Sequence, residues 1–157
     1  MSNAPARRNP SIDYTRGSFL ITVNAHRRQS CWGRIGRTEL HISPLGECVA
    51  EAWAVVVEQA DGVRSEAFVV MPDHVHAVVT LTHGNRSLSQ YVASFKSRAT
   101  RRAREQDLLA ADQTMWQPSF HDSLLRSRRA VLKAIQYVET NPERAIRRRN
   151  RRRRGDG

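Results

Sequence analysis

Two histidines separated by one residue, His74 and His76, are the residues whose spacing most directly suggests chemistry. Residues i and i+2 of a β-strand point to the same face of a sheet, so the two imidazoles are expected to lie side by side. Neighbouring imidazoles supply half of a metal site. Two unrelated surface histidines on a strand are the alternative interpretation. A histidine-triad nucleotide hydrolase is excluded, because its third histidine would fall at Val78.

A second group of chemically useful residues lies near the C-terminus, where Tyr137 is followed by Asn141 and Pro142. Tyr137 and Asn141 are four residues apart and are therefore expected to share one face of a helix. A tyrosine away from the apolar stripe of its helix is an accessible nucleophile, and an asparagine carbonyl oxygen is a ligand for a hard cation. The alternatives are that Tyr137 packs as a half-buried side chain and that Asn141-Pro142 only ends the helix.

The strands that position these groups are predicted from alternation and turn signals. Residues 18–24 form a β-branched and aromatic run, and a short strand is a candidate at residues 38–42. Residues 66–71 and 74–82 are two further strands, separated by Pro72-Asp73. They form either an antiparallel hairpin or one bulged strand. Residues 116–125 are expected to be irregular or extended.

Three helices are predicted from caps and apolar periodicity. Ser43 with Pro44 begins the first, which Asp61-Gly62 ends. The second follows a capping box formed by Ser87 and Gln90, and the third begins at Ser127 and ends near residue 141. The exposed side of the second helix is expected to hold Lys96, Arg98, Arg101, Arg102 and Arg104. The order of elements indicates an α+β fold, with an antiparallel sheet and helices packed on one of its faces.

The charge of the chain favours a polyanionic partner. Its 157 residues carry a formal net charge of +11, and all but two of the 26 basic residues are arginines. Arginine binds phosphate bidentately, which suits nucleic acid. Eight of the arginines and no acidic residue lie in residues 144–154, so most of the net charge is in this segment. The alternative is a basic tail that only increases solubility.

Several classes of protein are excluded by composition. The first ten residues are polar, so no secretory signal is expected, and no apolar run is long enough to span a bilayer. Cys31 and Cys48 form neither a CxxC motif nor a disulfide framework and are expected to be reduced cytoplasmic thiols. The chain has no Gly-rich phosphate loop, so no nucleotide cofactor is expected.

Motifs of a known family occur in order along residues 7–146. They are Asp13-Tyr14 with Gly-Ser-Phe-Leu-Ile-Thr at 17–22, Ser-Pro-Leu-Gly-Glu at 43–47 with Trp53, Phe-Val-Val-Met-Pro-Asp-His-Val-His at 68–76, Ser-Phe-Lys-Ser at 94–97, Trp116-Gln117, Phe-His-Asp at 120–122, Arg126, and Tyr-Val-Glu-Thr-Asn-Pro at 137–142. This set resembles the REP-associated tyrosine transposases, which are single-tyrosine HUH endonucleases of bacteria. The chain departs from the family at Asp73, where Asn is usual, and in its Arg-rich end, where an apolar finish is usual.

The resemblance implies a fold and a reaction. The fold is a ferredoxin-like or RRM-like antiparallel core with helices packed on it. Tyr137 is expected to attack a phosphodiester, forming a 5′-phosphotyrosine and a free 3′-OH that later rejoins strands. His74, His76 and Asn141 are expected to hold Mg²⁺ or Mn²⁺, which polarises the phosphate. His121 is an alternative third ligand, although a structural role is favoured for it.

The implied substrate is single-stranded or hairpin DNA that carries REP-type palindromes. We expect a basic arm at residues 1–17, a transposase domain at 18–146 and an Arg-rich tail at 147–157, in a cytoplasmic, nucleoid-associated monomer or homodimer. The candidate DNA-binding residues are Arg7, Arg8, Tyr14, Arg16, Lys96, Arg98, Arg101, Arg102, Arg126, Arg147, Arg148, Arg149, Arg151 and Arg152. The competing hypotheses are a non-catalytic DNA-binding protein with the same fold and a basic RNA-binding or ribosome-associated protein.

Overall fold

The computed structural model describes residues 8–82 and 84–155, which fold into one sheet, one small ribbon and four α-helices. Arg7, predicted to bind DNA, lies outside the described residues. In chain order the elements are β1 (Gly17–Asn24), the 3-10 turn η1 (His26–Arg28), β2 (Gly33–Ile35), β3 (Leu40–Ile42), α1 (Pro44–Gln59), β4 (Val63–Val70), β5 (His74–Leu81), α2 (Leu88–Glu105), β6 (His121–Leu125), α3 (Arg128–Glu139) and α4 (Asn141–Gly155).

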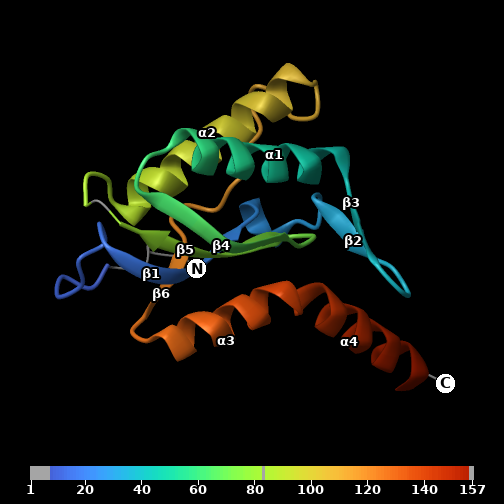
Figure 1. Cartoon of the computed structure of the whole chain (residues 1–157). Coiled ribbons are helices and arrows are strands. Elements are labelled where there is room, and N and C mark those ends of the chain that lie inside the picture. The colour runs from blue at the N-terminus through green and yellow to red at the C-terminus, as the bar shows by residue number, and fades with distance from the viewer. Residues whose placement is uncertain (1–7, 83, 156–157) are drawn as a thin grey trace.

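The main sheet is antiparallel throughout and has the strand order β4-β5-β1-β6. The α+β fold predicted from the sequence is confirmed. β4 and β5 form a hairpin, which decides between the two arrangements considered for this pair of strands. β2 and β3 form a separate two-stranded ribbon beside the sheet (Figure 1). None of the described helices has the length and apolar character needed to cross a membrane.

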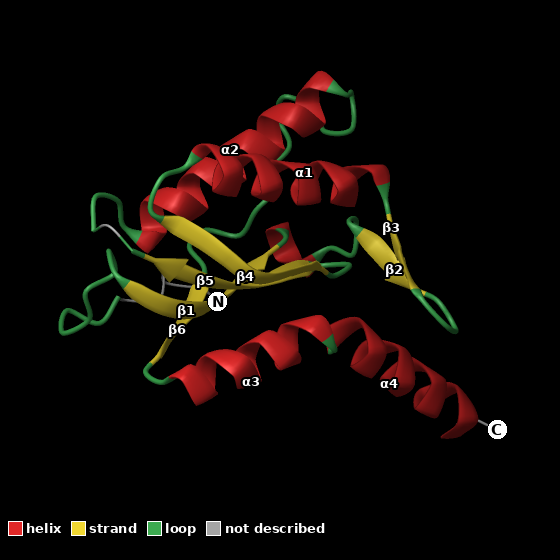
Figure 2. Cartoon of the chain, viewed as in Figure 1, coloured by secondary structure: helices red, strands yellow, loops and turns green. Residues whose placement is uncertain are grey.

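Helices cover both faces of the sheet, so the expectation that they share one face is wrong (Figure 2). α1 and α2 lie over one face, and the larger core between them and the sheet includes Val75 and Val79 of β5. α3 lies over the other face, where Val78 of β5 packs with Ala134 and Val138 in a second, smaller core. Alternate residues of β5 therefore enter different cores, and both faces of this strand need a cover.

The starts of α1, α2 and α3 are those that the sequence predicts. The Ser43 hydroxyl accepts a hydrogen bond from the Gly46 amide (3.1 Å) and caps α1. Ser87 and Gln90 form the complete capping box of α2, and the Ser127 hydroxyl caps α3 by accepting from the Ala130 amide (3.1 Å). These bonds satisfy amides that the first turn of a helix leaves without a partner.

The end of the chain differs from the sequence expectation. α3 stops at Glu139, close to the predicted end, but a new helix begins at once with Asn141. Pro142 is compatible with this because it lies in the first turn of α4, where its missing amide hydrogen costs no hydrogen bond. α4 runs without a break across residues 146 and 147, where the domain and the tail were expected to meet. The segment expected to be irregular or extended contains β6.

The start of α1 depends on a glycine. The Trp32 carbonyl accepts a hydrogen bond from the Ser43 amide (3.0 Å), which brings the chain before α1 against the first turn. A Cβ atom at Gly46 would overlap this carbonyl oxygen and would lie 2.7 Å from Cγ2 of Ile42. Position 46 therefore has no room for a side chain, although glycine is a poor helix former.

We predict that Gly46→Ala lowers the free energy of unfolding by about 1–3 kcal/mol, because overpacking outweighs the gain in helix propensity. Urea denaturation at constant pH measures the change. Gly155→Ala is the matched control, since nothing lies within 4 Å of a Cβ atom there. Equal stability of the Gly46→Ala protein and the wild type would contradict the close approach of Trp32 to α1.

Candidate active site

Three aromatic side chains from two elements meet on the face of the sheet that α3 covers. The rings of His74 and His76, both on β5, have centroids 4.6 Å apart, and the ring of Tyr137, on α3, lies 5.4 Å from that of His76. His76 is buried, whereas Tyr137 is 42% exposed. The predicted nucleophile and the two predicted ligands are therefore brought together, with the phenol open to solvent.

Both imidazoles are held through the same nitrogen. The Nδ1–H of His74 donates to Oδ1 of Asp73 (2.6 Å), and Nδ1 of His76 is hydrogen-bonded to the hydroxyl of Thr22 (2.9 Å). Thr22 lies on β1 directly opposite His76 in the sheet register. A hydrogen bond at Nδ1 fixes the orientation of a metal-ligating imidazole and leaves its Nε2 available to bind the ion.

Asp73 connects the histidine pair to a strained turn. Its second carboxylate oxygen accepts from Nε and Nη2 of Arg28, each at 2.9 Å. Arg27 and Arg28 have positive φ angles of 52° and 54° in η1, a backbone conformation that is unfavourable for arginine. Burial acts to raise the pKa of Asp73, but the hydrogen bonds from His74 and Arg28 outweigh it and lower the pKa, so the carboxylate is charged at neutral pH.

His76 is held in its neutral form. Burial, and next the positive charge that His74 acquires on protonation, lower the pKa of His76 to about 4. Arg144 and Arg28 add smaller contributions in the same direction. Neutral imidazole is the form that binds a metal ion, so no proton has to leave His76 at physiological pH.

Asn141 reaches the site from a different helix than Tyr137. The two residues were expected on one helix face, but α3 ends between them and Asn141 is the first residue of α4. Asn141 is buried, and its carboxamide has no hydrogen-bond partner among the described residues. It lines a cavity of about 610 Å³ together with Asp73 and His74. A carboxamide that borders the same cavity as His74 and has no partner among the described residues leaves an oxygen available for an ion.

His121 does not complete the site. It lies on β6 opposite Thr22, and Thr22 in turn lies opposite His76, so the central strand β1 separates the two histidines. Among the described residues, no third His, Cys, Asp or Glu joins His74 and His76 in a group that could hold a metal. The alternative in which His121 is a ligand has no support in this geometry.

Arg144 is a site residue that the sequence reasoning missed. Its guanidinium carbon lies 4.3 Å from the centroid of the Tyr137 ring, and Nη2 donates to the Tyr137 carbonyl (2.6 Å). Nη1 donates to the hydroxyl of Thr140 (3.1 Å), at the break between α3 and α4. Arg144 thus holds both the ring and the helix end in place. Nothing in the sequence separates it from the other arginines of the C-terminal run.

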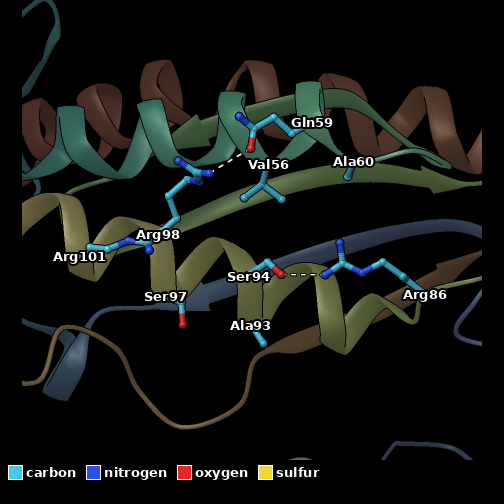
Figure 3. A pocket seen from close by; sticks show the side chains of 9 residues that line it. All are labelled: Val56, Gln59, Ala60, Arg86, Ala93, Ser94, Ser97, Arg98 and Arg101. Carbon is cyan, nitrogen blue, oxygen red and sulfur yellow. Dashed lines mark hydrogen bonds between the residues drawn. The ribbon is translucent and has the colours of Figure 1, made fainter.

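The predicted DNA-binding residues of α2 lie across the sheet from the histidines. Arg98 and Arg101 line a cavity of about 570 Å³ between α1 and α2 (Figure 3), and Nη2 of Arg98 donates to Gln59 (3.0 Å). Arg102 pairs with Glu51 of α1 at 3.3 Å. These arginines therefore lie on the far face of the sheet, away from Tyr137.

Lys96 is not the exposed side chain that the sequence analysis expected. Its ammonium group donates to the carbonyls of Gln117 (2.9 Å) and Ser119 (2.6 Å). Burial lowers the pKa of Lys96 to about 8, and the charge of Arg8 adds to this effect. The helical spacing placed Lys96 on the polar face correctly, but it did not show that the segment before β6 covers that face.

The described residues of the basic arm pack against the domain. Arg8 pairs with Asp122 at 2.7 Å and stacks on the ring of Phe120 at 3.8 Å. Tyr14, predicted to stack on a base, stacks on Phe19 of the core at 5.6 Å. Arg16 lies beside Gly84, and Arg126 is exposed just before α3.

The predicted tail residues divide into two groups. Arg148, Arg149 and Arg152 line the cavity next to His74, and Arg147 and Arg151 do not.

Comparison with known proteins places the chain in a family. A family model described as IS200-like transposase matches residues 24–141. A REP-associated tyrosine transposase solved with a bound REP hairpin has a similar fold, with a TM-score of 0.65, 22% identity, and coverage of 92% of this chain and 74% of that one.

Two further relatives match most of the chain. One is the crystal structure of a putative transposase from Deinococcus radiodurans R1, with a TM-score of 0.55, 16% identity, and coverage of 89% of this chain and 97% of that one. The other is an uncharacterized protein of Haemophilus influenzae, 20% identical over 149 residues that cover 82% of this chain and 81% of that protein. The chain belongs to the IS200-like transposase family, and its fold is that of a REP-associated tyrosine transposase.

Proposed function

We propose that this protein is a metal-dependent endonuclease and strand transferase that acts on single-stranded or hairpin DNA through a covalent bond to Tyr137. One observation carries the proposal: the exposed phenol lies against His76 in a site where Nδ1 of both imidazoles is already occupied. Such a site has a nucleophile and a place for a cation within reach of one phosphate group.

In the proposed reaction, the Tyr137 hydroxyl oxygen attacks the scissile phosphorus and loses its proton to solvent. The bond from phosphorus to the 3′ oxygen breaks, so the products are a 5′-phosphotyrosine and a DNA 3′-OH. The reverse attack by a 3′-OH releases Tyr137 and joins two strands. The phosphodiester energy is conserved in the covalent intermediate, so the reaction needs no nucleotide cofactor.

The residues present fit a divalent cation. His74 and His76 would each offer Nε2, and Asn141 would offer its carboxamide oxygen, which has no other partner among the described residues. Two imidazoles and one amide oxygen form a mixed set that suits Mn²⁺ or Mg²⁺ when phosphate and water oxygens complete it. When bound, the cation polarises a non-bridging phosphate oxygen. Arg144 holds the Tyr137 ring in position for the attack.

The fold also suggests the form of the DNA. A tyrosine on a helix packed against the sheet reaches a phosphate only where the DNA strand is unpaired or frayed, which favours single strands and hairpin ends. The structural relative with a bound REP hairpin supports REP-type palindromes as the substrate class. A non-catalytic DNA-binding protein with this fold remains the competing function, and it predicts binding without a covalent product.

The first experiment is an adduct assay. Wild-type protein is mixed with Mn²⁺ and a labelled pool of single-stranded oligonucleotides that contain imperfect palindromes and randomised flanks. We expect an SDS-resistant protein–DNA adduct, and Tyr137→Phe is expected to abolish it while it changes DNA affinity less than about threefold, because only the hydroxyl is lost. Tyr91→Phe is the control. An adduct with the Tyr137→Phe protein would show that another residue is the nucleophile.

A second prediction concerns Asp73. We expect Asp73→Ala to weaken Mn²⁺ binding by about 10- to 100-fold, because His74 loses the acceptor that orients it. Asp73→Asn is expected to have a smaller effect, since an amide oxygen still accepts from Nδ1–H. Electron paramagnetic resonance of free Mn²⁺ measures the affinity. Glu66→Gln is the control, because Glu66 is a strand carboxylate that pairs with an arginine (2.7 Å) far from the site. Unchanged affinity in Asp73→Ala would contradict the role of Asp73.

A third prediction follows from His76. The pKa of His76 is about 4 in the folded protein and has the ordinary value of 6.5 in the unfolded chain. Between pH 4 and pH 6.5, His76 therefore binds a proton more readily when the chain is unfolded. The free energy of unfolding should therefore decrease as pH falls through this window. In EDTA, we expect His76 to contribute about 1–2 kcal/mol of this loss between pH 7 and pH 5. Urea denaturation of His76→Gln should show a correspondingly flatter pH dependence, and identical curves for the two proteins would contradict the prediction.

A further inference from the structure

We infer that one face of α4 is a binding track for the phosphate backbone of the DNA strand next to the cleaved bond. This inference rests on the proposed function. The cavity of about 610 Å³ that holds His74 and Asn141 extends along α4, where Arg148, Arg149, Arg152 and Arg153 line it. His74 and Asn141 of the candidate site therefore share one cavity with these guanidinium groups.

The arginines of α4 divide by helical face. Ala145, Arg148, Arg149, Arg152 and Arg153 follow the 3–4 residue spacing of a single face, and this face begins at Asn141. From Asn141 to Arg152 the helix rises about 16 Å, which is enough to follow several phosphates. The other arginines of α4, Arg144, Arg147, Arg151 and Arg154, do not line the cavity.

The positive charge of the track is not compensated. Among the described residues, no carboxylate pairs with Arg148, Arg149, Arg152 or Arg153. Asp73, the one acidic residue that lines the cavity, is occupied by His74 and Arg28, and Glu143 pairs with Arg147 outside the cavity. A row of unpaired guanidinium groups beside the site attracts phosphates.

One nitrogen of the track is buried without a partner. Nη1 of Arg149 is inaccessible to solvent and has no hydrogen bond within the described part of the chain. A buried donor without an acceptor is costly, and a guanidinium donor is best satisfied by an oxyanion. Arg149 also lines the cavity, and within the described part of the chain no hydrogen bond or ion pair of its guanidinium competes with an anionic ligand there.

Two hydrogen bonds, from Arg144 and from Asn150, connect α4 to the rest of the domain. Arg144 ties its start to the carbonyl of Tyr137 (2.6 Å), and Nδ2 of Asn150 donates to the carbonyl of Arg37, between β2 and β3 (2.9 Å). These bonds hold α4 in the orientation in which the arginines of the track face the cavity. The track is thus preorganised for a strand that enters the active site.

The test compares two variants with equal charge loss on the same helix. The track variant is Arg148→Gln/Arg149→Gln/Arg152→Gln, and the matched control is Arg147→Gln/Arg151→Gln/Arg154→Gln. The probe is fluorescein-labelled dT20, whose affinity is measured by fluorescence anisotropy over a series of NaCl concentrations. Glutamine keeps the helix propensity of arginine, and circular dichroism and thermal melting verify the fold of each variant.

We expect the track variant to bind dT20 at least about tenfold more weakly than wild type. The slope of log affinity against log salt should become shallower by about 2. The control variant should stay within about threefold of wild type. Equal losses in both variants would overturn the inference, because charge alone would then explain binding. If the loss of Arg149 disturbs folding, Arg148→Gln/Arg152→Gln against Arg147→Gln/Arg151→Gln gives the same comparison with Arg149 intact.

The adduct assay separates this inference from the proposed function. If wild type forms the SDS-resistant adduct but the two variants bind dT20 equally, only the track is wrong. If wild type forms no adduct and the track variant alone loses affinity, the track is correct and the proposed cleavage is wrong. The first result leaves the role of Tyr137 in place, and the second leaves a DNA-binding protein with this fold.

Discussion

The packing of α3 against β5 is the interaction on which the site depends. Val138 and Ala134 of α3 contact Val78 of β5 in the smaller core, and this contact places Tyr137, one residue before Val138, against His76. The alternate residues of β5, Val75, Ala77, Val79 and Leu81, are buried in the larger core on the side of α1 and α2. Apolar contacts thus cover both faces of β5. On the face toward α3, the strand begins with the polar residues His74 and His76.

The electrostatics of the site follow from this burial. His76 is kept neutral because it is buried beside other groups that carry positive charge, and His74 is oriented by a carboxylate that Arg28 holds in place. The carboxylate of Asp73 supplies the negative charge that both His74 and Arg28 contact.

The sheet separates two groups of arginines that the sequence analysis proposed to bind DNA. Arginines of α2 face α1 on one side, with Gln59 and Glu51 as partners, while arginines of α4 line the cavity beside the histidines on the other. Of these two groups, only the arginines of α4 line the cavity that contains His74. At 22% identity to a REP-associated tyrosine transposase the fold is retained.

The sequence by itself determined the local structure. The caps at Ser43, Ser87 and Ser127 and the alternation that puts His74 and His76 on one strand face depend on residues within a few positions of each other, so their physics is visible in the sequence. The motifs also indicated the family, which the comparisons confirm.

Only the tertiary structure decided which distant groups meet. The pairing of Thr22 with His76 depends on the register of β1 against β5, and the division of the C-terminal arginines depends on how α4 is rotated against the cavity. The burial of Lys96 depends on a segment that crosses α2 from elsewhere in the chain. Arg144 stacks on Tyr137 because the chain breaks at Thr140 and starts a second helix. Such contacts are set by the sum of many weak packing terms across the whole fold, so no local pattern of residues encodes them.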